Sequence, residues 1–333
     1  MKTFCVKWKV FVAVSVVFVV SVLAAPALAA PEFTLKLGHL ANEDHTWHKG
    51  SLKFAEEVEK LSGGRIVCQV FPNEQLGNEV DTIQAIHTGI AHMVITGESM
   101  QNWAPKCALI AVPYMVRDMD HLTKVLTSDI GKEIEKDIID KVKLRPVSAF
   151  VRAPRNLTSN RPVTKPEELN GFKIRVPNVP LFVKVWETFS AKPTPMAFSE
   201  VFTSLQQNVI DGQENPLDLI RSGSLYEVQK YVNLTEHVYG WIYLVIGEEF
   251  FQKLPEDLQK AVVDAGKTAE AYERELFLAD VAANEQFLKE KGMEFVTVDK
   301  AAFAALAGPA VEEFLTTKPA DVLELYKKIV ETK

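Results

Sequence analysis

Cysteine is scarce in this chain, which has only three among its 333 residues. Cys5 precedes the apolar run of residues 10–23, so it cannot carry lipid after that run has been removed. Cys68 and Cys107 remain, and two cysteines do not make the disulfide framework of a small secreted domain. An exported chain could pair the two residues. We predict instead that both are buried free thiols.

Clusters of basic residues are also absent. The chain has 37 Lys and Arg against 44 Asp and Glu, which gives a formal net charge of −7. Binding to nucleic acid depends on grouped Lys and Arg that neutralise phosphates, so we expect no nucleic-acid partner. Hydrophobic content of 47% is ordinary for a soluble globular protein, and a chain of this length suits two domains.

Familiar catalytic motifs are missing as well. The sequence has no Gly-x-Ser-x-Gly elbow, no Walker loop, no dinucleotide-binding glycine pattern and no His-Glu-x-x-His. The densest group of possible metal ligands matches no zinc spacing and comprises His39, Glu43, Asp44, His45 and His48. We therefore expect neither a metal site nor a cofactor, and we expect no catalysis.

Only one long hydrophobic run is present, at residues 10–23. It follows Lys2, Lys7 and Lys9 and precedes the small residues of Ala27-Leu-Ala29. At about 14 residues it is shorter than the roughly 20 that span a bilayer. This pattern is typical of a cleaved signal peptide. We predict a signal peptide at 1–29 and export to the periplasm, without a membrane anchor.

Strands alternate with helices along the first part of the mature chain. We expect strands at 33–38, 66–71 and 92–95, helices at 47–61 and 78–89, a helical region at 119–142 and a strand at 143–151. This order favours an α/β fold with a mostly parallel sheet, whose ligand crevice lies beyond the carboxyl ends of the strands. Glu98 follows the third strand and is therefore a candidate pocket residue.

A weak internal repeat favours two lobes. Residues 82–92 and 201–211 both have the pattern of an amphipathic helix, a turn and a strand. Glu98 follows the first of these units and Asn215 follows the second. A chance likeness between two βα units would give the same pattern. We interpret it as two similar lobes, each a mixed, mostly parallel sheet flanked by helices, whose strand ends face each other across a cleft.

A long helical pattern runs from residue 255 to 291. At 1.5 Å per residue it corresponds to roughly 50 Å, so it either kinks at Gly266 or spans both lobes. An apolar strand at 241–248 precedes it, and a short strand at 293–298 and a terminal helix follow it. We place lobe I at 30–152 plus 241–280 and lobe II at 153–240 plus 281–333.

Two arginines are candidates for binding an anion. A guanidinium group offers paired N–H donors that match a carboxylate in a bidentate fork. Arg175 lies at a strand end between apolar neighbours, and Arg155 opens the preceding loop-like segment. A structural salt bridge to a buried acid explains such residues equally well. We interpret Arg152 and Arg161 as surface or loop charges.

Asn215 and Phe198 complete the candidate site in the second lobe. Pro216 biases Asn215 towards an extended backbone, from which its amide can reach a ligand. Capping of a turn is the commoner role for an asparagine in this position. Phe198 can form the floor of a pocket, although an apolar residue there is more often plain core.

Four segments together resemble the periplasmic solute-binding proteins of TRAP (tripartite ATP-independent periplasmic) transporters, the DctP family. They are Thr158-Ser-Asn-Arg161, Gly171-Phe-Lys-Ile-Arg-Val-Pro177, Pro193-Thr-Pro-Met-Ala-Phe-Ser-Glu200 and Asp211-Gly-Gln-Glu-Asn-Pro216. The resemblance implies a two-lobed periplasmic-binding-protein fold, in which crossing strands join the lobes, a long helix underpins both, and the lobes close around ligand.

The resemblance also implies roles for individual residues. Arg175 matches the family's carboxylate-binding arginine, Arg155 matches a second arginine that assists, and Asn215 matches the signature asparagine. Phe198 and Glu98 match pocket-lining positions of sialate-binding members. The first loop departs from those members, because His39-Leu-Ala-Asn42 replaces their small polar residues.

We predict that the ligand is a small organic acid. A polar first loop with His39, Asn42 and His45 suits hydroxyl groups, which favours a sugar acid such as a hexuronate. The alternatives are a C4-dicarboxylate, sialate or another carboxylate, a sensor that reports to a membrane receptor, and an exported enzyme that acts on carboxylates. The resemblance implies a monomer that delivers its ligand to the small and large membrane subunits of a TRAP permease, and whose only membrane contact is with them.

Overall fold

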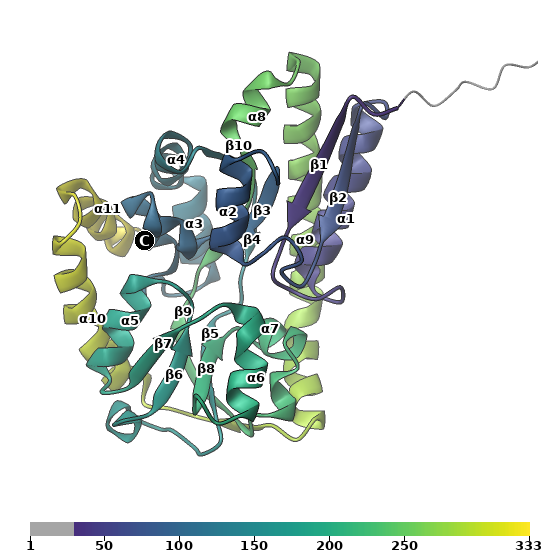
Figure 1. Ribbon diagram of the computed structural model, residues 1–333. Coiled ribbons are helices and arrows are strands. Elements are labelled where there is room, and N and C mark those ends of the chain that lie inside the picture. The colour runs from purple at the N-terminus through teal and green to yellow at the C-terminus, as the bar shows by residue number, and fades with distance from the viewer. Residues whose placement is uncertain (1–29) are drawn as a thin grey trace, which may run out of the picture.

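Two sheets of unequal size form the core of the molecule. The computed structural model describes residues 30–333, so the predicted signal peptide lies outside the described residues. Figure 1 shows the sheets one above the other, with α9 running from the upper lobe to the lower one. The upper sheet has five strands in the order β2-β1-β3-β10-β4, which are β1 (Phe33–Gly38), β2 (Ile66–Phe71), β3 (Met93–Thr96), β4 (Leu144–Val151) and β10 (Trp241–Gly247).

The lower sheet has six strands in the order β11-β9-β5-β8-β6-β7. β6 pairs in parallel with both β7 and β8, whereas β5 pairs antiparallel with β8 and β9. Each lobe is therefore an α/β unit with a mixed sheet, as predicted. The strands are β5 (Arg155–Ser159), β6 (Lys173–Val176), β7 (Lys192–Pro195), β8 (Gly212–Asn215), β9 (Tyr231–Val238) and β11 (Glu294–Val296).

The helices cover the faces of these sheets. In the upper lobe, the side chain of His45 accepts a hydrogen bond at the start of α1, and that of Asn78 does so for α2. The upper-lobe helices are α1 (Thr46–Leu61), α2 (Glu79–His87), α3 (Met119–Thr127), α4 (Asp129–Asp137) and α8 (Glu248–Lys253). Those of the lower lobe are α5 (Pro180–Thr188), α6 (Val201–Gln206) and α7 (Leu217–Ser222).

Two short connections between strands carry the chain from one lobe to the other. Residues 152–154 join β4 to β5, and Tyr239 and Gly240 join β9 to β10. β10 returns to the upper sheet between β3 and β4, and all seven of its residues are buried. A strand buried on both faces has a continuous apolar sequence, which explains the run seen at 241–248.

The long helix α9 (Glu256–Glu290) has 35 residues and spans both lobes. It packs on α1 and β4 of the upper lobe and on α7 of the lower lobe. Gly266 lets it approach β4 closely, because a Cβ atom there would lie 2.3 Å from the carbonyl oxygen of Val147. Close packing, not a break in the helix, therefore explains this glycine.

The last helix departs from the predicted lobe boundary. α10 (Lys300–Thr316) packs on α5 and β9 of the lower lobe, but α11 (Ala320–Glu331) contacts α4 and residues 105–111 of the upper lobe. The guanidinium of Arg117 donates 3.2 Å to the carbonyl of Val330, and a ring nitrogen of His121 lies 2.9 Å from that of Ile329. Our assignment of all of 281–333 to lobe II is therefore wrong for α11.

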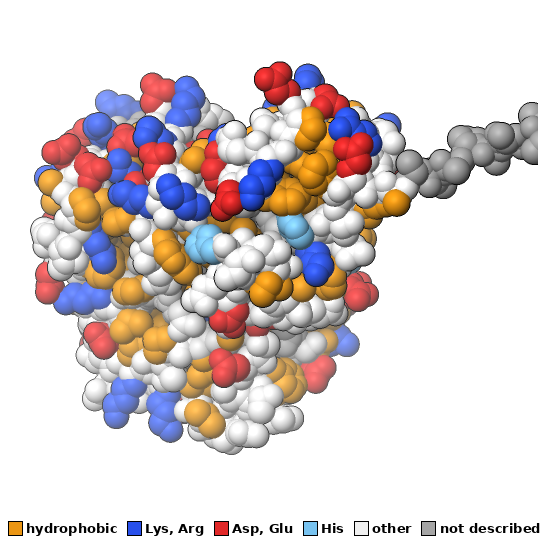
Figure 2. All heavy atoms as spheres, turned by 45° about the horizontal axis from the view of Figure 1, so that its top comes forward, with side chains coloured by type: hydrophobic (Ala, Val, Ile, Leu, Met, Phe, Trp, Pro, Cys, Tyr) orange, Lys and Arg blue, Asp and Glu red, His pale blue; other side chains and the backbone are white. Residues whose placement is uncertain are grey.

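Cys68 and Cys107 are free thiols, as predicted, although Cys68 is only partly buried. Within residues 30–333, no helix is both long enough and apolar enough to cross a membrane. On the face seen in Figure 2, acidic and basic side chains are intermixed.

Candidate functional site

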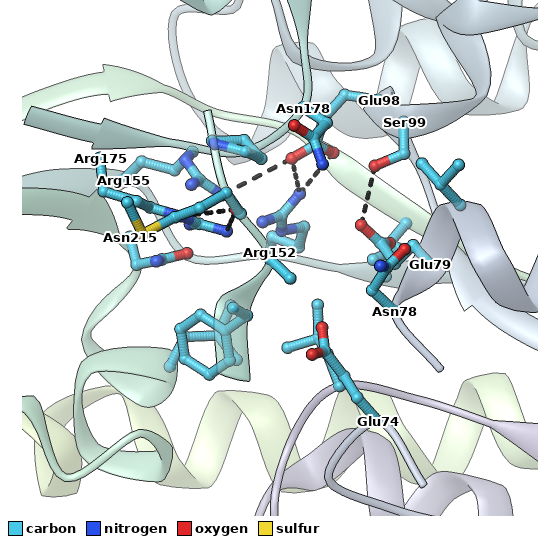
Figure 3. A pocket seen from close by; sticks show the side chains of 18 of the residues that line it. Glu74, Asn78, Glu79, Glu98, Ser99, Arg152, Arg155, Arg175, Asn178 and Asn215 are labelled. Carbon is cyan, nitrogen blue, oxygen red and sulfur yellow. Dashed lines mark hydrogen bonds and ion pairs between the residues drawn. The ribbon is translucent and has the colours of Figure 1, made fainter. Parts of the chain in front are cut away.

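A cavity lies between the lobes, where strand ends from both sheets meet. The space between its lining residues is about 540 Å³, which includes open solvent. Figure 3 shows Arg155, Arg175 and Asn215 on one side and Asn78, Glu79 and Glu74 on the other. The other lining residues are Leu40, Trp47, Val80, Glu98, Ser99, Arg152, Pro177, Asn178, Met196, Ala197, Phe198, Leu219 and Ile242.

Arg175 is the cation without a counter-ion. It lies on β6 and is only 4% exposed. Its Nε and Nη2 atoms donate to the carbonyl oxygen of Met196 at 3.1 and 2.8 Å, and no carboxylate of residues 30–333 forms an ion pair with it. Burial lowers the pKa of Arg175 to about 10. A buried charge is costly unless it is paired, so this guanidinium can take an anion from outside the chain as its partner.

Arg155, at the start of β5, is already paired within the chain. Its guanidinium forms a double ion pair with Glu214 of β8, and Nη2 lies 2.6 Å from Oε1 of that residue. Nε2 of His237 lies 2.9 Å from the same carboxylate. Burial opposes the charge on Glu214, but Arg155 and His237 outweigh it and lower the pKa of Glu214 to about 2. For Arg155 the structural salt bridge, which the sequence left open, is present.

Arg152 lines the cavity, so our interpretation of it as a surface or loop charge is wrong. It lies at the first lobe crossing and is 5% exposed. Its Nη1 atom donates to both oxygens of Glu98 at 2.8 and 2.7 Å. The Nη1 atom of Arg155 lies 3.6 Å from Oε1 of Glu98, which therefore faces two arginines. Burial acts against the charge on Glu98, and the two arginines lower its pKa below the usual value.

Asn215 and Phe198 border Arg175. The amide nitrogen of Asn215, at the end of β8, donates to Oε1 of Gln213 at 2.6 Å. The guanidinium carbon of Arg175 lies 5.9 Å from the centre of the Phe198 ring, within the range of a cation–π contact. The aromatic ring and the amide therefore form the immediate surroundings of the unpaired charge.

Three predicted site residues lie outside this cavity. His39 is buried against His48, with ring nitrogens 3.0 Å apart, and burial together with His48 lowers its pKa to about 3. Asn42 bonds to Ser222 of α7, whereas His45 caps α1 and lies 3.5 Å from Asp218. The first loop turns away from the cavity after Leu40. Its polar groups form contacts with α1 and with the lower lobe, not with the cavity.

The acidic side of the cavity was not predicted from the sequence. Glu79 is the first residue of α2, and its Oε2 atom accepts from the hydroxyl of Ser99 at 2.8 Å. Burial and the nearby Glu98 raise the pKa of Glu79 to about 7. Oε2 of Glu74 accepts from the backbone N–H of Ser199 across the cleft at 3.2 Å. Their position in the sequence could have indicated them. Both residues follow β2, Glu74 in the connection to α2 and Glu79 at its start, and this places them at the carboxyl edge of the sheet.

Comparison with known proteins identifies the family. Residues 37–318 match the DctP model, described as bacterial extracellular solute-binding protein, family 7. The chain belongs to this family. It is 56% identical over 292 residues to the solute-binding protein RD1_1052 of Roseobacter denitrificans, which covers 88% of this chain and 90% of that one. It is 32% identical to the sialic acid-binding periplasmic protein SiaP of Vibrio cholerae, over 88% of this chain and 91% of SiaP.

Solved structures agree with this assignment. A TRAP periplasmic solute-binding protein of Roseobacter denitrificans with bound L-galactonate is 53% identical, with a TM-score of 0.87 over 90% of this chain and 99% of that chain. One from Xanthobacter autotrophicus with bound β-D-galacturonate is 28% identical, with a TM-score of 0.86 over 90% and 100%. One from Sulfurospirillum deleyianum with bound succinate is 29% identical, with a TM-score of 0.85 over 91% and 100%. The chain is thus a TRAP solute-binding protein of a periplasmic family, with the fold predicted from its sequence.

Proposed function

We propose that this TRAP solute-binding protein captures a sugar acid and releases it, unchanged, to a membrane permease of one small and one large subunit. The observation that carries the proposal is the buried guanidinium of Arg175, which has no carboxylate partner within residues 30–333. A ligand carboxylate would supply the missing counter-charge. Arg155 then acts mainly by position, because its own charge is paired with Glu214.

The rest of the cavity favours a polyhydroxylated tail over an apolar one. Glu74 and Glu79 offer acceptor oxygens and Asn78 offers an amide, all from the upper lobe. Hydroxyl groups can donate to these oxygens and accept from the amide. The relatives with bound L-galactonate and β-D-galacturonate support the same ligand class.

Location and assembly complete the proposal. Residues 1–29 act as a cleaved signal peptide, and the mature protein works in the periplasm as a monomer. Capture requires no catalysis, no metal and no cofactor. Closure of the lobes excludes water, which strengthens the charge-assisted bonds to the carboxylate.

A thermal-shift screen of the mature, ligand-stripped protein tests this function. The panel contains L-galactonate, D-galacturonate, D-glucuronate, succinate, sialate and the neutral sugar D-galactose. A ligand that binds only the folded state raises Tm, because it stabilises that state by about 2.7 kcal/mol when its concentration is 100 times its Kd. We expect sugar acids to raise Tm and D-galactose to leave it unchanged. A rise with D-galactose alone would contradict the carboxylate reading, and chemical change of a bound acid, seen by mass spectrometry, would contradict capture without catalysis.

A further inference from the structure

The charges around the cavity do not balance as a simple anion site. Two of the three arginines are paired inside the chain, Arg152 with Glu98 and Arg155 with Glu214. One unpaired cation, Arg175, is left on the lower lobe. On the upper lobe, Glu79 and Glu74 line the cavity and form no ion pair with a basic residue of the described chain. The cavity is thus basic at one end and acidic at the other.

The two acidic side chains lie across the cavity from Arg175. Figure 3 shows Glu79 and Glu74 on the side opposite Arg175 and Asn215, with Asn78 beside Glu79. Each glutamate has one oxygen engaged, Glu79 by Ser99 and Glu74 by the N–H of Ser199. The second oxygen of each makes no hydrogen bond within residues 30–333, so it can accept from a ligand.

We propose that Glu79 and Glu74 form an acidic wall that limits the ligand to a single carboxylate. The protein accordingly selects sugar monoacids that end in a hydroxyl group. It rejects sugar diacids and C4-dicarboxylates. This inference rests on the proposed function, because it concerns the end of the ligand opposite the carboxylate that Arg175 binds.

The physical basis is a difference between a hydroxyl and a carboxylate at the same place. A hydroxyl carries a proton that it can donate to a glutamate oxygen, whereas an ionised carboxylate only accepts. Two carboxylates that share a small site repel each other, and one of them must take up a proton. Arg152 also acts on Glu79, but its charge is paired with Glu98, both of whose oxygens hold its Nη1 atom, so it offsets this repulsion only in part. Selectivity of this kind arises from a repulsive element as much as from attractive contacts.

The protonation state of Glu79 makes the selectivity of the acidic wall depend on pH. The charged groups that act on it are Glu98, Glu74, Arg152, Arg155 and Arg175, and Ser99 donates to it. Burial and Glu98 raise its pKa to about 7, so lowering the pH from 8 to 6 adds a proton to it. Protonation removes the repulsion and supplies a donor. Discrimination against a second carboxylate should therefore weaken as the pH falls.

The test compares two ligands that differ at one end only. L-Galactonate ends in a CH2OH group, and galactarate has a carboxylate in its place. Isothermal titration calorimetry at pH 8 measures both Kd values for the wild type, for Glu79→Gln, for Glu74→Gln and for the double variant. Glu59→Gln changes an exposed glutamate on α1 and serves as the control. We expect wild type and control to prefer L-galactonate by about 100-fold, and Glu79→Gln to reduce that ratio about tenfold or more, because like charges in contact cost about 100-fold or more in affinity.

The outcomes separate the inference from the function it rests on. If the wild type binds neither acid, both the proposed function and the acidic wall are wrong. If it binds L-galactonate and galactarate equally, or if the ratio is unchanged in Glu79→Gln, Glu74→Gln and the double variant, the capture of sugar acids stands and the wall is wrong. At pH 6 the preference of the wild type for L-galactonate over galactarate should fall towards that of Glu79→Gln. A wild-type preference that does not change with pH would contradict the role of Glu79.

Discussion

At the residue scale, three buried arginines have the same charge and different tasks. Arg152 and Arg155 are each held by a glutamate of the chain, whereas within residues 30–333 Arg175 donates only to a backbone carbonyl and lies near an aromatic ring. Removing one partner of a buried ion pair leaves an uncompensated charge, but removing a charge that has no partner does not. The effect of each arginine on stability should therefore differ from its effect on binding.

Arg155→Ala and Arg175→Ala should separate in stability. In the ligand-free protein we expect Arg155→Ala to lose about 3 to 5 kcal/mol of unfolding free energy, because Glu214 is left buried and unpaired. Arg175→Ala should lose less than about 1 kcal/mol, since an unpaired buried cation does not stabilise the fold. Urea denaturation after removal of ligand by unfolding and refolding measures both. Equal losses for the two variants would show that Arg175 is also a structural ion.

The candidate site could be predicted in part from the sequence. Five predicted residues line one cavity: Arg175, Arg155, Asn215, Phe198 and Glu98. They could be predicted because the family resemblance and the ends of the expected strands pointed to them. Their contacts with ligand stay predictions. The first loop could not be placed, because the sequence does not show that Asn42 bonds to Ser222, 180 residues away. Arg152 and Glu79 were missed for the same reason, since their partners are remote in sequence.

At the element scale, α9 packs on both lobes, and Gly266 lets it pack closely on β4. Gly266→Ala places a Cβ atom against the carbonyl of Val147, so the helix must shift. We expect a loss of about 1 to 3 kcal/mol in urea unfolding. Gly308→Ala in α10 is the matched control, because nothing lies within 4 Å of its Cβ position, and it should stabilise the protein by about 0.5 to 1 kcal/mol, the usual gain of alanine over glycine within a helix. Equal effects at both glycines would refute the packing role.

Glu273 makes the same helix sensitive to pH. It is 1% exposed, it accepts from the hydroxyl of Thr46 at 2.7 Å, and its second oxygen has no partner in the described chain. Burial raises its pKa to about 8. The folded protein thus keeps a proton on Glu273 up to about pH 8, whereas the unfolded chain releases it near pH 4.5. Stability contributed by this proton is full below pH 4.5 and is lost as the pH rises to 8.

Glu273→Gln mimics the protonated form and should flatten that pH dependence. We expect the variant to be more stable than the wild type at pH 8 by about 1 to 3 kcal/mol and similar to it at pH 5. Urea midpoints between pH 5 and pH 8.5 measure the difference. Glu275→Gln, an exposed change on the same helix, should follow the wild-type curve. Parallel curves for wild type and Glu273→Gln would mean that Glu273 is ionised in the folded protein.

Most elements could be predicted because their apolar period is strong. The strand expected at 92–95 is β3, and the helix expected at 255–291 is α9. The region 119–142 is less regular than expected, because Ser128 ends α3 and caps α4 with its side chain, and a short π-helical segment follows. A serine within a helical pattern does not show in advance whether it caps or points to solvent.

At the scale of the whole molecule, the lobes meet through polar bonds outside the cavity. The backbone N–H of Asn42 donates to the hydroxyl of Ser222 at 2.9 Å, and the side-chain amide of Asn42 donates to the Ser222 carbonyl at 3.1 Å. Glu74, which lines the cavity, accepts from the N–H of Ser199 and so forms a third bond between the lobes. These bonds join the upper lobe to the lower one, so they stabilise the arrangement in which the lobes enclose the ligand.

Ser222→Ala should weaken ligand binding without touching the carboxylate. It removes the hydroxyl that accepts from Asn42, and one hydrogen bond contributes about 0.5 to 1.5 kcal/mol. We therefore expect the Kd for L-galactonate to rise about 2- to 10-fold in calorimetry. Thr88→Ala removes an exposed hydroxyl whose bonds stay within α2 and its cap, and it should leave the Kd unchanged. Unchanged binding in Ser222→Ala would show that this bond does not contribute to closure.

The central claim is that the unpaired guanidinium of Arg175 binds the carboxylate of the ligand. Calorimetric titration of L-galactonate into the wild type, Arg175→Ala and Arg161→Ala tests it most directly, because Arg161 is an exposed arginine of the same lobe. Arg175→Ala should lose about 2 to 5 kcal/mol of binding free energy, roughly 30-fold to several thousand-fold in Kd. Arg161→Ala should bind like the wild type. A Kd in Arg175→Ala equal to that of the wild type would contradict the account.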